Sequence, residues 1–356
     1  MASIMTNAAA LTALQSLNAT NKSLEQTQAR ISTGYRVSEA ADNAAYWSIA
    51  TTMRSDNSAL STVQDALGLG ASKVDTAYTG MNNVLSTIGQ IKTKLLSSVG
   101  QSDANKAKTQ TEITALQAQM KSFADAATFS GSNYLSVTSK QVAAANDGVQ
   151  ADAQIVSSFN RSSSGAISLG TIDIDVESTK LFDTGLSTAV KNQGILDRKT
   201  SIYSTAADQS AYDAAYATAI AGGATDIAAN TTAQAAVTGT PVKIDNVSAF
   251  NLDITATGVT DDIITQMVTK IDNVMSQLTD AATVLGAAKS SIDLQKTFTQ
   301  SLMDSIDRGV GQLVDADMNK ESTRLQALQV QQQLGIQSLS IANSSSQSIL
   351  QLFKNG

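Results

Sequence analysis

Apolar residues recur at alternating spacings of three and four between positions 60 and 95 of the chain. The series runs Leu60, Val63, Leu67, Gly70, Val74, Ala77, Met81, Val84, Ile88, Ile91 and Leu95, and only Gly70 lacks an apolar side chain. This spacing places the series on one face of a helix and is typical of a coiled-coil seam. At a rise of about 1.5 Å per residue, the helix would be roughly 54 Å long.

A second, shorter helix is predicted after a reversal of the chain. The segment from Gly100 to Asp103 combines glycine with small polar residues and is typical of a turn. The apolar residues that follow it at helical spacing are Ile113, Leu116, Met120 and Phe123. We therefore expect a helix, a reversal and a second helix in this arm.

The carboxyl-terminal part of the chain repeats the seam pattern. Its apolar positions are Ile264, Val268, Ile271, Met275, Leu278, Ala282 and Leu285. Thr260 and Asp261 precede them and suit the first positions of a helix. The two arms together predict a mainly α fold, an elongated helical hairpin or coiled-coil bundle of N-terminal and C-terminal arms.

The middle of the chain has a different pattern, with apolar and polar residues in strict alternation. It occurs at Thr171–Val176, Val242–Asp245 and Asn251–Thr255, and it predicts half-buried strands. The alanine-rich segment from Ser204 to Val237 is compatible with either helix or loop. We place a small mixed α/β outer insert domain at residues 141–260.

The two ends of the chain carry apolar residues that one molecule does not obviously bury. The N-terminal set is Ile4, Leu11, Leu14, Leu17, Leu24 and Ile31, and the C-terminal set is Leu325, Leu328, Leu339, Leu350 and Phe353. A second C-terminal face holds Ala327, Val330, Leu334 and Ile341. Two apolar faces need more than one neighbour. Either the ends are unfolded or frayed in the monomer and become ordered when they pack against each other and against other subunits, or they simply pack on the rod within one molecule.

Composition excludes most chemistry. The chain has no histidine and no cysteine, which removes imidazole bases, thiolate nucleophiles and nearly every zinc or iron–sulfur site. A formal net charge of -7 argues against a nucleic acid or an anionic membrane as partner. No apolar run approaches the roughly 20 residues of a membrane helix. The first residues carry no positive charge ahead of an apolar stretch, so no cleaved signal peptide is expected.

Paired carboxylates are the remaining candidates for metal binding or proton transfer. Asp315 and Asp317 lie two positions apart, and so do Asp173 and Asp175. Positions two apart do not face each other on a helix, and on a strand they share a face but lack further ligands here. We therefore expect no catalytic site, no metal and no cofactor.

Two motifs resemble those of bacterial flagellins. The segment Ala29–Ala45 reads ARISTGYRVSEAADNAA and is similar to the characteristic amino-terminal segment of that family, with Gly34, Arg36, Asp42 and Asn43 as matching positions. The segment Leu313–Glu321 is similar to the carboxyl-terminal motif, with Asp315, Asp317 and Glu321 matching. The resemblance covers about the first 140 and the last 95 residues.

The resemblance implies a structural subunit of the helical flagellar filament, exported unfolded and folded at the filament tip. Its implied parts are inner-core helices at 1–42 and 313–356, rod arms at 43–140 and 261–312, and the exposed insert. Implied partners are other subunits, other flagellins in a mixed filament, the flagellar export apparatus with a chaperone, and cap and hook-associated proteins. Tyr46-Trp47 departs from the common Gly-Leu and looks like flagellins of plant-associated alphaproteobacteria.

Three other interpretations remain. Heptads alone are typical of a generic coiled-coil structural protein. A hook–filament junction protein would share the terminal arms, although the Asn-Ala-Ala and Leu-Val-Asp-Ala-Asp segments together favour the filament subunit. A secreted coiled-coil translocator or adhesin is the alternative from a different class, and it would form no long filament.

Overall fold

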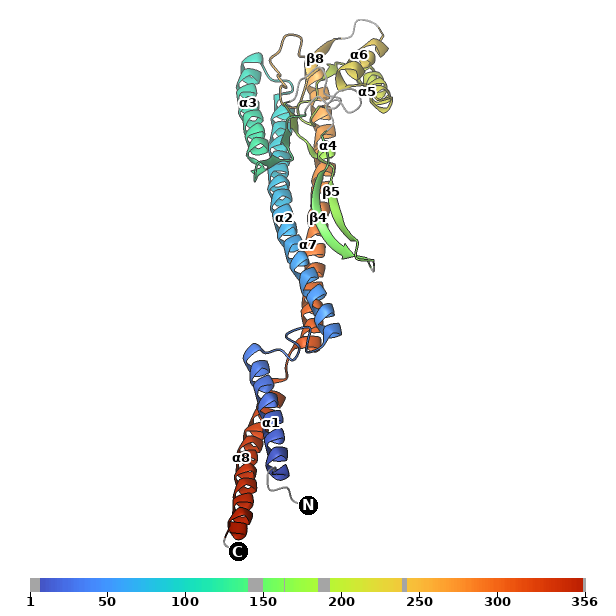
Figure 1. The fold of residues 1–356 in the computed structure, drawn as a ribbon. Helices are drawn as coiled ribbons and strands as arrows, with labels where there is room; N and C mark the ends of the chain where they lie inside the picture. Colours follow the sequence, from blue (N-terminus) through green and yellow to red (C-terminus); the bar gives the residue numbers. More distant parts are fainter. Residues whose placement is uncertain (1–6, 140–149, 163, 185–192, 239–241, 355–356) are drawn as a thin grey trace. The chain divides into compact units, whose positions relative to one another are not determined.

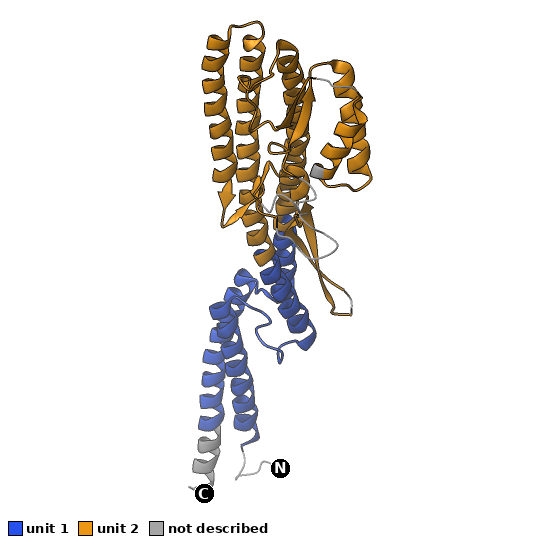
Figure 2. Cartoon of the chain, turned by 90° about the horizontal axis from the view of Figure 1, so that it is seen from above, with its two compact units in different colours: residues 1–61, 301–356 blue, residues 62–300 orange. Residues whose placement is uncertain are grey.

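The chain is mainly helical and divides into two compact units in its computed structural model (Figure 2). One unit holds residues 1–61 and 301–356, and the other holds residues 62–300. The structure describes residues 7–139, 150–162, 164–184, 193–238 and 242–354, without the side chains of residues 227 and 345–354. The predicted mainly α class, with two helical arms and a small strand-containing insert, is confirmed.

Figure 1 follows the elements along the chain. The helices are α1 (Ala8–Thr33), α2 (Ala44–Ser98), α3 (Asp103–Ala126), α4 (Val176–Thr179), α5 (Ala206–Ala221), α6 (Asp226–Ala236), α7 (Asp261–Val314) and α8 (Met318–Lys354). The strands are β1 (Thr128–Phe129), β2 (Ser132–Asn133), β3 (Ser136–Val137), β4 (Ala153–Arg161), β5 (Ile167–Ile174), β6 (Phe182–Asp183), β7 (Thr200–Tyr203) and β8 (Lys243–Val247). Helices α2 and α7 contribute residues to both units.

The unit of residues 62–300 is built around α2, α3 and α7. Polar pairs fix an antiparallel register between α2 and α7: the Gln64 amide donates to Gln300 over 2.7 Å, and Lys92 pairs with Asp272 at 2.6 Å. Lys289 and Asp75 form a third pair between the same helices. The buried apolar seams of the two helices run along the same stretch of the hairpin.

Strands β4 and β5 form an antiparallel hairpin that packs on the helices of this unit. Ile155 of β4 lies directly over Gly70, where an added Cβ would stand 2.5 Å from the Ile155 Cγ2. The missing side chain in the α2 seam therefore makes room for the close approach of the hairpin. The sequence did not predict β4, because Ser157 takes an inward position and a bulge after Val156 breaks the alternation.

Strands β7 and β8 pair antiparallel and pack with two short helices, α5 and α6. Tyr203, Tyr212 and Ala233 form a small buried cluster among these elements. Thr205 and Thr225 cap the two helices through their hydroxyl oxygens. The alanine-rich segment Ser204–Val237, for which the sequence allowed either helix or loop, therefore forms two helices.

The predicted strand at Asn251–Thr255 is wrong. Leu252 and Ile254 are buried, at 1% and 2% exposure, as an alternating pattern requires. Their backbone groups bond to glutamine side chains of α3 instead of a neighbouring strand. The Gln110 and Gln117 amides each donate to the Leu252 carbonyl over 3.1 Å, and the Ile254 amide donates to Gln110 over 3.0 Å. Side chains thus replace the missing strand partner.

The predicted helix boundaries in this unit are confirmed. Gly100 has φ of 74° and ends the turn between α2 and α3. The Thr260 hydroxyl accepts a hydrogen bond of 3.3 Å from the Ile263 amide at the start of α7. Lys106 pairs with Asp261 at 2.7 Å and ties this start to α3.

Candidate assembly surfaces

Helices α1 and α8 form an antiparallel pair in the unit of residues 1–61 and 301–356 (Figure 1). The Asn7 amide donates to the Ala342 carbonyl over 3.0 Å, and the Gln332 amide donates to Asn21 over 2.8 Å. Near the other end, Arg30 pairs with Glu321 at 3.3 Å. Polar contacts therefore set the register along the whole described pair.

A small residue on α8 lets the two helices approach closely. An added Cβ at Gly335 would lie 3.2 Å from the Leu17 Cδ1. Leu24, Ile31, Leu325 and Leu339 are partly buried, and Leu328 is 8% exposed. With Leu17, six of the predicted assembly residues therefore lie at the contact side of this pair or next to it, so the two ends pack against each other.

The opposite side of α8 stays uncovered in the described chain. Val330, Leu334 and Ile341 are 55%, 58% and 68% exposed. At 3.6 residues per turn these three positions lie within about 40° of one another and roughly opposite Leu328 and Leu339. On α1, Leu11 and Leu14 are also exposed, at 58% and 44%. The pair therefore buries one apolar face of α8 and leaves a second one free.

Three predicted assembly residues cannot be placed. Ile4 lies outside the described residues, and so do the side chains of Leu350 and Phe353, although the α8 backbone continues to Lys354. The assembly role of the whole set stays a prediction.

The amino-terminal motif forms a corner at the end of α1. Gly34 has φ of 76° and caps the helix, and its amide donates to the Arg30 carbonyl over 2.9 Å. Arg36 then donates through Nη2 to the Leu313 carbonyl over 2.9 Å. The amides of Arg36 and Val37 both donate to the Val314 carbonyl, over 2.6 and 3.2 Å. The end of α7 is thus bound to the segment after α1.

Asp42 and Asn43 shape the start of α2. The Asp42 carboxylate accepts from the Ser38 amide over 2.9 Å and from the Ser38 hydroxyl over 3.2 Å. These hydrogen bonds lower the pKa of the Asp42 carboxyl below its usual value, and the Ser38 amide is the main cause. The Asn43 side chain accepts from the Tyr46 amide over 3.1 Å and so caps the helix.

The carboxyl-terminal motif completes the same corner. Asp315 pairs with Tyr35 through an isolated antiparallel bridge, and the Ala316 amide donates to the Gly34 carbonyl over 2.8 Å. Asp317 caps α8 by accepting from the Asn319 amide over 3.0 Å. Glu321 is 6% exposed and forms the ion pair with Arg30. Sequence reasoning named these residues by resemblance alone and missed that the two motifs contact each other.

The apolar seam residues of the two long helices are buried in the described chain, with one exception. Buried are Leu60, Val63, Leu67, Val74, Met81, Val84, Ile88, Ile91 and Leu95 on α2, and Ile264, Val268, Ile271, Leu278 and Leu285 on α7. Met275 is only partly buried. Helix α7 buries Ile263, Met267, Val274, Ala281 and Ile292 as well. The α7 apolar face is wider than a two-helix seam because α7 also contacts the insert.

The paired aspartates have structural roles. Asp317 and Asp175 each cap a helix, and the Asp175 side chain accepts from the Ser178 amide over 3.1 Å. Within the described residues, no three or more His, Cys, Asp or Glu side chains are grouped so that they could hold a metal ion. In that same part of the chain, no helix combines the length and apolarity needed to cross a membrane.

Comparison with known proteins matches both arms to one family. Residues 4–140 match the bacterial flagellin N-terminal helical region, and residues 268–353 match the bacterial flagellin C-terminal helical region. The residues of the corner fall inside these two ranges, and so does nearly all of the α1–α8 pair.

Relatives extend the match over the whole chain. Flagellin C of Rhizobium meliloti (strain 1021) is 47% identical, with 99% of this chain and 100% of the relative covered. The flagellin of Brucella melitensis biotype 1 is 45% identical at the same coverage. Flagellin A of Rhizobium meliloti (strain 1021) is 43% identical, again over 99% and 100% of the two chains. The chain therefore belongs to the bacterial flagellin family, the structural subunits of the extracellular flagellar filament.

Proposed function

We propose that the chain polymerises with copies of itself, alone or together with other flagellins, into the helical filament used for swimming. The second apolar face of α8 carries this proposal. Val330, Leu334 and Ile341 are more than half exposed although α8 already packs on α1. Contiguous exposed apolar surface on a helix marks a surface that another protein covers.

A second copy of the chain is the occupant that fits this face. The exposed residues Leu11 and Leu14 of α1 lie in the same unit and offer the complementary apolar surface on a neighbour. Contact between two different patches of identical subunits is a head-to-tail interface, which grows into an open helix when its rotation does not close. Other predicted assembly residues lie on the inner side of the α1–α8 pair and stabilise the helix that carries this face. They are Leu17, Leu24, Ile31, Leu325, Leu328 and Leu339.

Export in an unfolded state suits the same helices. With no cysteine the chain forms no disulfide that would block transport. An isolated pair of polar-rich helices is marginally stable, so its order depends on packing. Burial at about 25 cal/mol per Å² of apolar surface then offsets the entropy of ordering at the filament tip. Folding and assembly are coupled in this account.

The five-part division gives each segment a role. Residues 1–42 and 313–356 form the inner core, residues 43–140 and 261–312 form the rod arms, and residues 141–260 form the exposed insert. The export apparatus, a chaperone, and cap and hook-associated proteins are the further partners. A filament of this kind has no nucleic acid or membrane partner and needs neither catalysis nor a cofactor.

Electron microscopy of seeded assembly tests the proposal. Full-length chain is compared with a version that lacks residues 1–35 and 325–356. We expect long tubular filaments from the full-length chain only. Filaments from neither version would favour a hook–filament junction protein or a secreted translocator. Filaments from both would show that the terminal helices do not drive assembly.

A further inference from the structure

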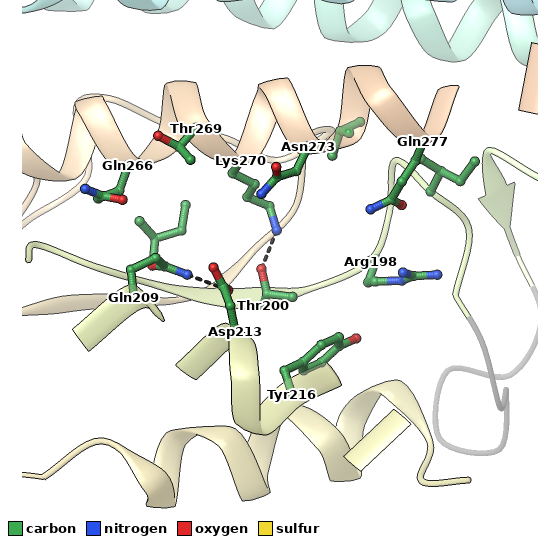
Figure 3. Close-up of a pocket in the computed structure, with 13 residues that line it drawn as sticks. Arg198, Thr200, Gln209, Asp213, Tyr216, Gln266, Thr269, Lys270, Asn273 and Gln277 are labelled. Carbon is green, nitrogen blue, oxygen red and sulfur yellow. Dashed lines mark hydrogen bonds between the residues drawn. The ribbon is translucent and has the colours of Figure 1, made fainter. Parts of the chain in front are cut away.

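A polar cavity of about 150 Å³ lies in the unit of residues 62–300, between α7 and the insert (Figure 3). Helix α7 forms one wall. The other walls come from α5, strand β7 and the residues just before β7. Lys270 points into the space from α7, with Asp213 and Tyr216 of α5 on the opposite side and Arg198 at one end.

The cavity residues of α7 include a stripe of polar side chains that recur at the three-and-four spacing of one helix face. Gln266, Lys270, Asn273 and Gln277 follow one another at intervals of four, three and four, and all line the cavity. The residues one position later, Met267, Ile271, Val274 and Leu278, form the neighbouring apolar stripe and are buried. Gln266 and Lys270 are partly buried, whereas Asn273 and Gln277 are exposed, so this wall opens towards solvent.

Lys270 is the most unusual member of the stripe. Its ammonium donates to the Thr200 hydroxyl, and within the described residues no carboxylate lies at ion-pair distance from it. Burial lowers the pKa of Lys270 to about 8, assisted by the Arg198 charge and opposed by Asp213. Of the three N–H donors of this ammonium, one therefore has a protein partner among the described residues.

The charges around the cavity cancel. The Arg198 Nε lies 3.6 Å from an Asp226 carboxylate oxygen, and the Tyr216 hydroxyl donates to the same carboxylate over 2.7 Å. Asp213 accepts from Gln209 over 2.9 Å and faces Lys270 across the cavity at more than ion-pair distance. A net-charged ligand gains little in such surroundings, and an anion would also meet the Asp213 carboxylate.

The donor and acceptor inventory favours a ligand with hydroxyl groups. Lys270 and the carboxamides offer donors, whereas Asp213 and the carboxamide oxygens offer acceptors. A neutral ligand that bonds to both sides must accept from one wall and donate to the other, and adjacent hydroxyl groups can do this. Ile195, Ile202 and Val274 supply apolar surface for carbon atoms. A cavity of about 150 Å³ holds roughly six non-hydrogen atoms.

We propose that this cavity binds a vicinal diol, presented either by a small free polyol or by the edge of a sugar residue. One hydroxyl accepts from the Lys270 ammonium, and the adjacent hydroxyl donates to the Asp213 carboxylate. The amides of Asn273 and Gln277 bond to the same oxygens, and the carbon atoms lie against the aliphatic side chains. The site lies between α7 and the insert, apart from the α1–α8 pair that carries the proposed assembly face.

Saturation-transfer NMR on the full-length chain tests the site. Glycerol and erythritol represent free polyols, a methyl pyranoside represents a sugar edge, and acetate and inorganic phosphate represent anions. We expect saturation of at least one diol probe and none of the anions. Saturation of glycerol or erythritol alone assigns the free polyol, and saturation of the pyranoside assigns the sugar edge.

Two variants and two matched controls decide whether the signal comes from this cavity. Lys270→Met and Asp213→Asn are expected to weaken binding of the diol about tenfold each, as the loss of one hydrogen bond to a charged group implies. Lys296→Met and Asp280→Asn change exposed residues of α7 outside the cavity and should leave binding unchanged. Circular dichroism verifies that each variant keeps its helices.

Three results would overturn the proposal. The first is no saturation of any diol at millimolar concentration, which would leave a cavity filled by water. The second is binding of acetate or phosphate in place of the diols. The third is diol binding that the Lys270 and Asp213 variants do not weaken.

Discussion

Gly70 is the one position in the α2 seam without a side chain, and the structure shows why a side chain is absent there. Heptad periodicity alone would favour an apolar residue there. The structure places Ile155 so close that an added Cβ would meet its Cγ2 at 2.5 Å and its Cδ1 at 2.8 Å. We therefore expect Gly70→Ala to destabilise the chain, against both the helix propensity and the seam pattern.

The expected magnitude is the balance of two terms. Replacing glycine by alanine inside a helix stabilises it by about 1 kcal/mol. Forcing a methyl group into a packed site destabilises by about 1–3 kcal/mol. We expect a net loss of about 0–2 kcal/mol at Gly70. Gly68 and Gly89 lie in the same helix with open space at the Cβ position, so alanine there should stabilise by up to about 1 kcal/mol.

A double-mutant cycle with Ile155 isolates the contact. Ile155→Ala alone removes a buried side chain and should destabilise by about 2–5 kcal/mol. The added methyl at position 70 has room once Ile155 is shortened. The double variant should therefore be less destabilised than the sum of the single variants, by about 1–2 kcal/mol.

Urea unfolding of the depolymerised full-length chain, followed by far-ultraviolet circular dichroism, measures these free energies. Stabilisation by Gly70→Ala to the same extent as at Gly68 and Gly89, with no coupling to Ile155, would refute the placement of the β4–β5 hairpin on α2. The controls use the same helix, so propensity cannot account for a difference.

Three further predictions concern the Arg30–Glu321 ion pair, the hydrogen bond from Gln117 to the Leu252 carbonyl, and the buried carboxyl group of Asp197. Arg30→Met leaves the buried Glu321 carboxylate without its ion pair. The substitution should therefore lower the local stability of α1 by about 1–3 kcal/mol, which hydrogen exchange of the α1 amides would measure. Unchanged protection of these amides would contradict this prediction. Gln117→Leu removes the donor to the Leu252 carbonyl and should destabilise by about 1–3 kcal/mol in the same urea assay, whereas the exposed Gln119→Leu should change little. Burial raises the pKa of Asp197 from 3.8 to about 6, so the folded state binds its proton more tightly and stability falls as pH rises from about 4 to about 6. Asp197→Asn should remove this dependence and stabilise the chain above pH 6 by at most about 3 kcal/mol, and equal pH profiles of variant and parent would count against it.

Local periodicity was enough to predict the long helices. The α2 seam from Leu60 to Leu95 is buried at every predicted position, because each residue's face follows from 3.6 residues per turn. On α7 the same reasoning found only part of the buried surface, since contacts with the insert widen it. Met275 was placed in the core and is only partly buried.

Contacts between distant segments were beyond the sequence pattern. Gln110 and Gln117 satisfy the backbone near Leu252 from another helix, so an alternating segment is buried without being a strand. The contact between Gly34 and Ala316 likewise joins two motifs that are far apart in the chain. No local rule pairs such residues, because their proximity is a property of the folded backbone.

The two apolar faces of α8 were visible in the sequence, but which one the molecule buries was not. Leu328 is buried while Leu334 is exposed, and the close approach of Leu17 to Gly335 lies on the side of α8 that faces α1. The candidate assembly surface therefore needed both the pattern and the structure.

The critical concentration for seeded assembly of Leu334→Asp tests the central claim most directly. Leu334 is exposed, so the monomer should keep its circular dichroism spectrum. A carboxylate buried without a partner at a subunit contact should raise the critical concentration about 100-fold or more. Val242→Asp places the same charge at a comparably exposed site in the insert and should assemble like the parent chain. Assembly of Leu334→Asp at the parent concentration would contradict the claim that a neighbouring subunit covers this face of α8.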